Sequence, residues 1–211
     1  MRSRPTSLLD FRDRALLSVC YEAACPIEKL LAVSIGDNGT IVAAKIGGSA
    51  RKLTCRNVVH VDGKPHILFE SSAKRLFVWL KKLRASGCLF GADAKMFPAL
   101  HSNRYDVFDR CIGRTTAAAI FDKYFSDTGI KALGFSGLRR AGIARQLAWG
   151  LHPKAVFALS GYGHIRSIYG IADEYDLQIK TDEGNPFQEI SPHSYVLNAQ
   201  GFSTRIASRL M

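Results

Sequence analysis

The chain has 211 residues, 47% of them hydrophobic, which is enough to bury the core of one domain with an appendage. Its 29 Lys and Arg outnumber its 18 Asp and Glu, so the net charge of +11 excludes an acidic protein and favours a polyanionic partner such as nucleic acid. No run approaches the roughly 18 apolar residues of a membrane span, and the start lacks the apolar stretch of a signal peptide, so we expect a cytoplasmic protein without a membrane partner.

The first predicted elements are two helices. Apolar residues recur at helical spacing from Ala15 to Val33, and Asp10 and Asp13 are acids at the beginning of this pattern. Pro26 lies in its middle and has no backbone N–H to donate, so it should divide the stretch into two helices. The residues before the pattern, 1–11, are interpreted as an N-terminal arm.

A small antiparallel sheet is predicted next. Its connecting turns should be at Gly47–Ser49 and Asp62–Gly63, because Gly and Asp favour the conformations of tight turns. The strand-like runs are Thr40–Ile46, Leu53–Val61 and His66–Glu70. The sheet is therefore inserted between helices.

The sequence predicts four further helices in the region after the sheet. For the first of them Ser71 and Ser72 are the expected N-cap, and Lys81 and Lys82 should lie on its outer face. The stretch from Gly91 to Asn103 has no clear period and reads as a loop. The predicted helices are Ser71–Ala85, Tyr105–Phe125, Ser136–Trp149 and Pro153–Leu159.

The C-terminal region beyond Gly170 is acidic and rich in turn residues. Only Gln200–Leu210 regains a helical apolar stripe, which would pack either on its own body or on a second copy in a homo-oligomer. We therefore expect an arm over 1–11, a domain over 12–170 and a tail over 171–211. The fold class expected is mainly α with a small antiparallel β-sheet (α+β).

The five cysteines are odd in number and lack the close pairs of zinc and redox motifs. We expect buried free thiols, no metal site and no cofactor. The cysteines are Cys20, Cys25, Cys55, Cys88 and Cys111.

Two stretches of the chain concentrate its basic residues. From Lys45 to Arg84 there are ten Lys and Arg against Asp62 and Glu70, and from Thr128 to Ala172 there are six and no acid. The two stretches would form one face that binds nucleic acid. The alternative is a basic surface that is merely solvated.

Three segments resemble the catalytic domain of tyrosine recombinases and phage integrases. Residues 12–31, RDRALLSVCYEAACPIEKLL, are similar to the family's opening R-D-R-A-L-L and the Y-x-T-G-L-R-I-S-E-L-L that follows it. Residues 135–140, FSGLRR, resemble its H-x-L-R helix start, and residues 159–162, LSGY, resemble its L-L-G-H turn, with Tyr169 shortly after. The matches keep the family's order over residues 12–170.

The resemblance implies a metal-independent transesterification on DNA. In such a domain a tyrosine hydroxyl attacks a phosphodiester and leaves a phosphotyrosyl link. Two arginines neutralise the non-bridging oxygens of the transition state, while a lysine and one or two histidines move protons.

The sequence keeps only part of the residues that this chemistry uses. The resemblance places the second arginine at Arg139, but the first arginine is replaced by Pro26, with Lys29 at the neighbouring acidic position. The family's two histidines correspond to Ser136 and Tyr162, and neither can shuttle a proton near neutral pH.

The remaining catalytic candidates follow from the same resemblance. Tyr169 is the candidate nucleophile, although it stands seven residues after Tyr162 where the family usually has nine, and Tyr175 is a poorer second choice. Lys64, after the Asp62–Gly63 turn, best fits the hairpin lysine, and Lys52 is nearly as suitable. His164 would substitute for the missing histidine if its loop is remodelled.

We interpret the chain as a binder of double-stranded DNA on a recombinase-like scaffold without full strand-cleavage activity. It would serve in regulation, in segregation of a mobile element, or as an accessory factor. One alternative is an active recombinase built on Arg139, Lys64, His164 and Tyr169. Another is a helix-turn-helix regulator formed by Gly142–Leu147, a turn at Gly150 and the helix from Pro153. The expected DNA-binding residues are Lys45, Arg51, Lys52, Arg56, Lys64, Lys81, Lys82, Ser136, Arg139, Arg140, Arg145 and Arg166.

Overall fold

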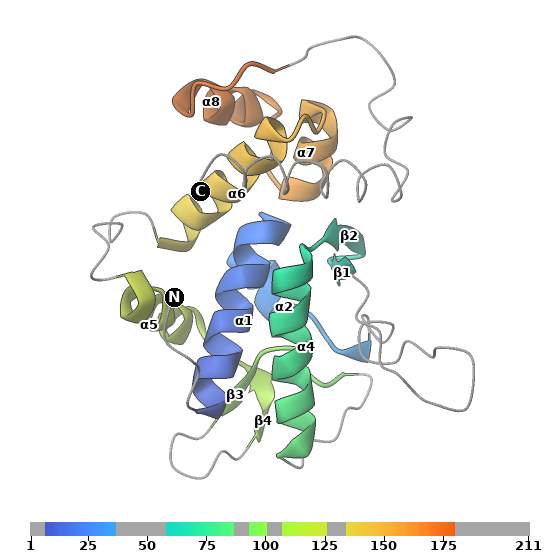
Figure 1. The fold of residues 1–211 in the computed structure, drawn as a ribbon, viewed down its shortest axis with the longest axis vertical. Helices are drawn as coiled ribbons and strands as arrows, with labels where there is room; N and C mark the ends of the chain where they lie inside the picture. The colour runs from blue at the N-terminus through green and yellow to red at the C-terminus, as the bar shows by residue number, and fades with distance from the viewer. Residues whose placement is uncertain (1–6, 37–57, 87–92, 101–106, 126–133, 180–211) are drawn as a thin grey trace, which may run out of the picture. The chain divides into compact units, whose positions relative to one another are not determined.

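The computed structural model describes residues 7–36, 58–86, 93–100, 107–125 and 134–179. These residues are mainly helical and include two small antiparallel sheets, which confirms the expected α+β class (Figure 1). The chain divides into two compact units, Met1–Arg139 and Arg140–Met211.

Two helices open the first unit, as the sequence predicts. α1 (Leu8–Ala23) begins after Ser7, whose Oγ accepts a hydrogen bond from the Asp10 N–H at 3.1 Å, and it ends at Ala24 in the left-handed conformation. α2 (Ile27–Ala32) follows Pro26, so the predicted break is confirmed. Because α1 already begins at Leu8, the expected boundary between arm and domain at residue 12 falls inside a helix.

The core of the first unit forms where α1 packs against α4 (Glu70–Ala85), and Figure 1 shows the two helices side by side. Leu16 of α1 and Leu76 and Trp79 of α4 are completely buried there. The Trp79 indole N–H donates a hydrogen bond to the Met96 carbonyl at 2.9 Å. This bond joins α4 to the segment that precedes the next strands.

The N-cap predicted for α4 is wrong. The helix begins at Glu70, and Phe69, at its cap position, makes no side-chain cap. The Glu22 carboxylate of α1 replaces it, accepting hydrogen bonds from the Phe69 N–H and from the Ser72 hydroxyl, both at 2.7 Å. An acid is favourable there, because helix N-termini carry free N–H groups and a partial positive charge.

The first hairpin consists of β1 (Val58–Val61) and β2 (Lys64–Ile67). Val61 pairs with Lys64, and Asp62 and Gly63 between them both have positive φ, at 54° and 71°. This is the geometry of a two-residue turn with Gly at its second position, so the predicted turn is confirmed.

The ends of the predicted strands differ from the observed ones. The strand expected to reach Glu70 stops at Ile67, because Glu70 is the first residue of α4. The predicted strand Thr40–Ile46, the turn Gly47–Ser49 and residues 53–57 lie outside the described residues.

A second hairpin replaces part of a predicted helix and part of a predicted loop. β3 (Pro98–Leu100) pairs with β4 (Val107–Cys111), and the register shifts between Pro98 and Leu100. α5 (Arg114–Phe125) therefore begins nine residues later than the Tyr105 expected from the sequence. Strands this short show little alternation, which is why their period is not visible in the sequence.

The last helices surround a small core in the second unit. The helices are α6 (Gly134–Ala148), α7 (Pro153–Ser160) and α8 (Arg166–Glu174), and the boundary between the units falls inside α6. Ile143, Val156 and Ile168 are completely buried. The expected domain end at residue 170 falls inside α8, and the predicted helix Gln200–Leu210 lies outside the described residues.

Two general expectations are tested by the described residues. Cys20 and Cys25 are buried free thiols, as predicted, whereas Cys111 is a free thiol that is only half-buried. Cys55 and Cys88 are not among the residues described. Within the described ranges, no helix has the length and apolar character needed to cross a membrane.

Candidate nucleic-acid interface

Arg12 and Asp13, which begin the family-like segment 12–31, lie in the core of the first unit. Arg12 and Asp13 are both buried, and the Arg12 guanidinium donates to Asp13 Oδ1 from Nε at 3.0 Å and from Nη2 at 2.8 Å. Burial raises the pKa of Asp13, and the neighbouring Arg12 charge opposes that rise. Lys123 of α5 lies 2.8 Å from Asp10 and 3.8 Å from Asp13, so the three charges join α5 to α1.

Arg139, the arginine that the resemblance retains, lies near the end of the first family-like segment. Burial raises the pKa of the Cys20 and Cys25 thiols, that of Cys25 to about 12, and the charge of Arg139 opposes the rise at both. Such an influence requires that the guanidinium lie close to the thiols. The charge of Arg139 therefore acts at Cys25, the residue before Pro26.

One aromatic and one aliphatic side chain hold the beginning of α6 in place. Phe135 and Leu138 pack against the core of the first unit, and the Phe135 ring lies 5.6 Å from that of Phe121 in α5. Arg139 follows directly after Leu138. The packing of this first turn thus fixes where the Arg139 backbone lies in the first unit.

The β1–β2 hairpin is attached to the same end of α1 by two contacts. Lys29 of α2 donates to Asp62 in the turn at 2.5 Å, and this hydrogen bond holds the pKa of Asp62 below its usual value. His66 of β2 is buried and hydrogen-bonds to the Ala23 backbone, while burial lowers its pKa to about 4. Lys64 is exposed on this anchored hairpin.

The β1–β2 hairpin and α2 meet at the C-terminal end of α1, where the charge of Arg139 is also felt. His66 of the hairpin hydrogen-bonds to the Ala23 backbone, and Lys29 of α2 pairs with Asp62 in the hairpin turn. The charge of Arg139 acts at Cys25. The sequence identified Arg139 and Lys64, but it gave no signal that Lys29 and His66 hold the hairpin. Of the other expected DNA-binding residues, Lys45, Arg51, Lys52 and Arg56 lie outside the described residues.

The outer face of α4 carries exposed bases, as expected for Lys81 and Lys82. Lys82 Nζ also lies 5.6 Å from the centre of the Phe11 ring. The acid Glu70 stands at the opposite end of the helix, where it matches the helix dipole. The exposed bases of α4 are Lys74, Arg75, Lys81, Lys82 and Arg84.

Two basic residues of the second unit contact other side chains, which the sequence did not indicate. Arg140 forms an ion pair with Glu174 of α8, so part of its charge is offset. The Arg145 guanidinium lies 4.4 Å from the centre of the Trp149 ring. Arg166 is exposed at the first position of α8.

Ser136 lies inside α6 and is not its N-cap, whereas the sequence predicts a helix that begins at Ser136. The helix begins at Gly134, so Ser136 is its third residue and is exposed within the first turn. A helix N-cap has to precede the first helical residue, and Ser136 does not. Its hydroxyl remains available at the surface.

The tyrosine and histidine candidates all lie in the second unit. Tyr169 is half-buried in α8, one residue after the buried Ile168. Tyr162 and His164 lie in the connection between α7 and α8, where His164 is exposed and Tyr162 is half-buried. Arg139 belongs to the first unit, whereas these tyrosine and histidine candidates belong to the second.

The helix-turn-helix alternative finds limited support in the geometry. α6 and α7 are joined by residues 149–152, which include Gly150 at φ 85°, and this is the length of connection that such motifs use. However, Lys154 is the single Lys or Arg of α7, whose sequence is PKAVFALS. A recognition helix normally presents several polar or basic side chains to DNA, so α7 suits this role poorly.

No protein-family model matches the chain, and no curated protein shows significant similarity to it. The resemblance to tyrosine recombinases therefore depends on the three sequence segments alone.

Proposed function

We propose that the chain binds double-stranded DNA with a scaffold like the catalytic domain of tyrosine recombinases and that it lacks the full strand-cleavage machinery. The observation that supports this proposal is that the end of α1 is both the attachment point of the Lys64 hairpin, through His66 and Ala23, and the region whose Cys25 thiol feels the charge of Arg139. In the recombinase family the corresponding arginine and lysine face a DNA phosphate. A regulatory, segregation or accessory role for a mobile element fits a protein that binds without cutting.

Charge supports duplex DNA as the partner. The net charge of the chain is +11, and α4 has five exposed bases. Contacts from such bases to phosphates release counterions and supply most of the affinity for DNA of any sequence. The positive end of the α6 dipole adds to the charge of Arg139, which lies in the second turn of this helix.

The departures from the family pattern support binding without cleavage. Pro26 has no side-chain donor for a phosphate oxygen, and Ser136 and Tyr162 stand where the family has histidines. Loss of one charged donor to a transition state typically costs about 3 to 4 kcal/mol. An arrangement that lacks the first arginine and both histidines is therefore expected to hold a phosphate far better than it cleaves one.

Duplex binding should weaken steeply as salt is added. Each neutralised phosphate contributes about −0.9 to the slope of log affinity against log salt concentration. Replacing Lys81 and Lys82 together with alanine should make the slope shallower by about 1.8 and weaken binding to unrelated duplexes equally, as phosphate contacts do. Fluorescence anisotropy with labelled duplexes at several salt concentrations measures both quantities.

Two results would contradict this proposal. An affinity that does not change with salt would exclude a phosphate-binding surface. A covalent protein–DNA adduct on a nicked duplex, formed by the wild type and absent in Tyr169→Phe, would instead establish an active recombinase.

A further inference from the structure

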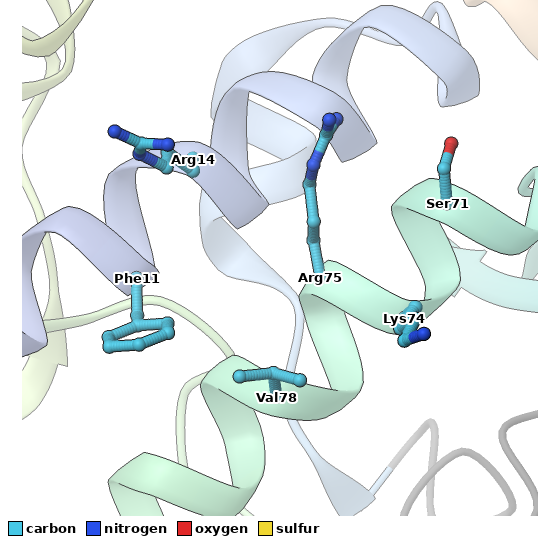
Figure 2. A pocket seen from close by; sticks show the side chains of 6 residues that line it. All are labelled: Phe11, Arg14, Ser71, Lys74, Arg75 and Val78. Carbon is cyan, nitrogen blue, oxygen red and sulfur yellow. The ribbon is translucent and has the colours of Figure 1, made fainter. Parts of the chain in front are cut away.

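Arg140, one of the residues expected to bind DNA, has its charge paired with an acid of its own unit. Its Nη2 forms an ion pair with the Glu174 carboxylate of α8, and both side chains are partly exposed. Arg75, which lines the pocket between α1 and α4 in Figure 2, makes a different kind of contact. Its Nη1 donates at 2.8 Å to the hydroxyl of Ser18, a neutral partner that leaves the positive charge of Arg75 in place.

The end of α8 holds Glu174 in a defined position. Ile171 and Ala172 are completely buried in the core of the second unit. After the helix, Asp176 adopts the left-handed conformation at φ 51°, and the Leu177 N–H donates to the Ala172 carbonyl at 2.9 Å. These are the features of a closed helix C-terminus. Glu174 therefore presents its carboxylate from a backbone that is fixed on both sides.

The position of Glu174 does not favour the helix to which it belongs. The free carbonyl groups of a helix C-terminus carry a partial negative charge, so acids are unfavourable in the last turn. α8 has Asp173 and Glu174 there and no base. The partner that compensates the charge of Glu174 is Arg140 of α6.

A DNA phosphate and the Glu174 carboxylate would compete for the same group. Both anions match the fork of N–H donors that an arginine presents, so one of them excludes the other from a given edge of the guanidinium. Arg140 directly follows Arg139 in α6, and a duplex carries about one phosphate charge per 1.7 Å of its axis. A duplex held at Arg139 would thus bring phosphates toward Arg140. Exposed ion pairs are weak, so a phosphate can displace the carboxylate.

We propose that Glu174 is an internal competitor of DNA, which occupies a phosphate-binding edge of Arg140 and so restrains the affinity for duplexes of any sequence. This inference rests on the proposed DNA-binding function and concerns the regulation of that surface. A duplex has to displace the Glu174 carboxylate before Arg140 contacts a phosphate.

Fluorescence anisotropy with labelled duplexes of unrelated sequence tests this proposal on the full chain. Glu174→Gln keeps the size of the side chain and removes its charge. Asp173→Asn is the matched control, because it removes the same charge at the neighbouring exposed position of α8. Glu174→Gln should raise the affinity about twofold to fivefold more than Asp173→Asn does, which is the range for an exposed ion pair.

The same two substitutions in an Arg140→Ala background separate the ion pair from the general effect of charge. Without Arg140 there is no guanidinium to release, so Glu174→Gln and Asp173→Asn should then bind DNA alike. Thermal unfolding checks that all variants are folded.

The proposal is overturned if the two neutral variants bind DNA equally while Arg140 is present, or if Glu174→Gln keeps its advantage in the Arg140→Ala background. In either case a wild type that binds duplexes leaves the proposed function intact. A wild type that binds no duplex overturns the proposed function and this inference together.

Discussion

Glu22→Ala is expected to lower the free energy of unfolding by about 3 to 5 kcal/mol. The buried carboxylate accepts hydrogen bonds from the Phe69 N–H and the Ser72 hydroxyl, both at 2.7 Å, and it is the side chain that caps α4. A hydrogen bond to a charged group contributes about 1.5 to 3 kcal/mol, and removal of this acceptor leaves two donors without it. The loss acts on the interface between α1 and α4, where Leu16 and Trp79 are buried.

Urea unfolding of Glu22→Ala and of two further variants measures this effect. Glu22→Gln keeps the volume and one oxygen acceptor, so it should lose less stability than Glu22→Ala. Glu28→Ala is the control, because Glu28 is exposed and its ion pair with Arg114 lies at the surface, where such pairs contribute about 1 kcal/mol or less. Equal losses for Glu22→Ala and Glu28→Ala would show that α4 does not depend on the Glu22 cap.

The stability of the chain should also fall as the pH is lowered from 6.5 to 4, because of His66. Burial lowers the pKa of His66 from 6.5 to about 4, so the folded protein keeps the imidazole neutral over this range. The unfolded chain binds a proton there, and stability therefore rises with pH. The stabilisation is fully present above about pH 6.5 and is lost as the pH falls to about 4. At 1.36 kcal/mol for each pKa unit, the loss amounts to about 3 kcal/mol.

Comparison with His66→Leu isolates this contribution from those of the acidic residues. Between pH 7 and pH 4 the wild type should lose about 3 kcal/mol more than His66→Leu, which has no group to titrate at this position. His164→Leu, at an exposed position, should follow the wild type. Parallel curves for the wild type and His66→Leu would mean that the hairpin is not anchored through a buried imidazole.

Local signals in the sequence predict local structure well in this protein. Pro26 separates α1 from α2 because it lacks an N–H, and Asp62–Gly63 forms the β1–β2 turn because these residues accept positive φ. The β3–β4 pair and the Glu22 cap were missed. Both depend on partners that are distant in sequence, and neither a short strand nor a lone acid in a helix indicates its partner.

The roles of Arg139 and Lys64 stay predictions. The family-like order of the segments pointed to both residues, and the structure adds that the Lys64 hairpin is attached to the end of α1 through His66. The sequence did not indicate that Arg12 and Asp13 form a buried ion pair, because an Arg and an Asp that bind a ligand look the same in a sequence. The sequence also did not indicate that Glu174 of α8 offsets the charge of Arg140 in α6, because the two residues are 34 positions apart in the chain.

Duplex DNA affinity of Arg139→Ala, compared with the wild type at several salt concentrations, tests the central claim most directly. If Arg139 holds a phosphate, the variant should lose about 1 to 3 kcal/mol of binding free energy, and its salt slope should be shallower by about one. Lys154→Ala, at an exposed position of α7, is the control and should bind as the wild type does. Affinity and salt slope that are unchanged in a folded Arg139→Ala variant would contradict the proposed DNA surface.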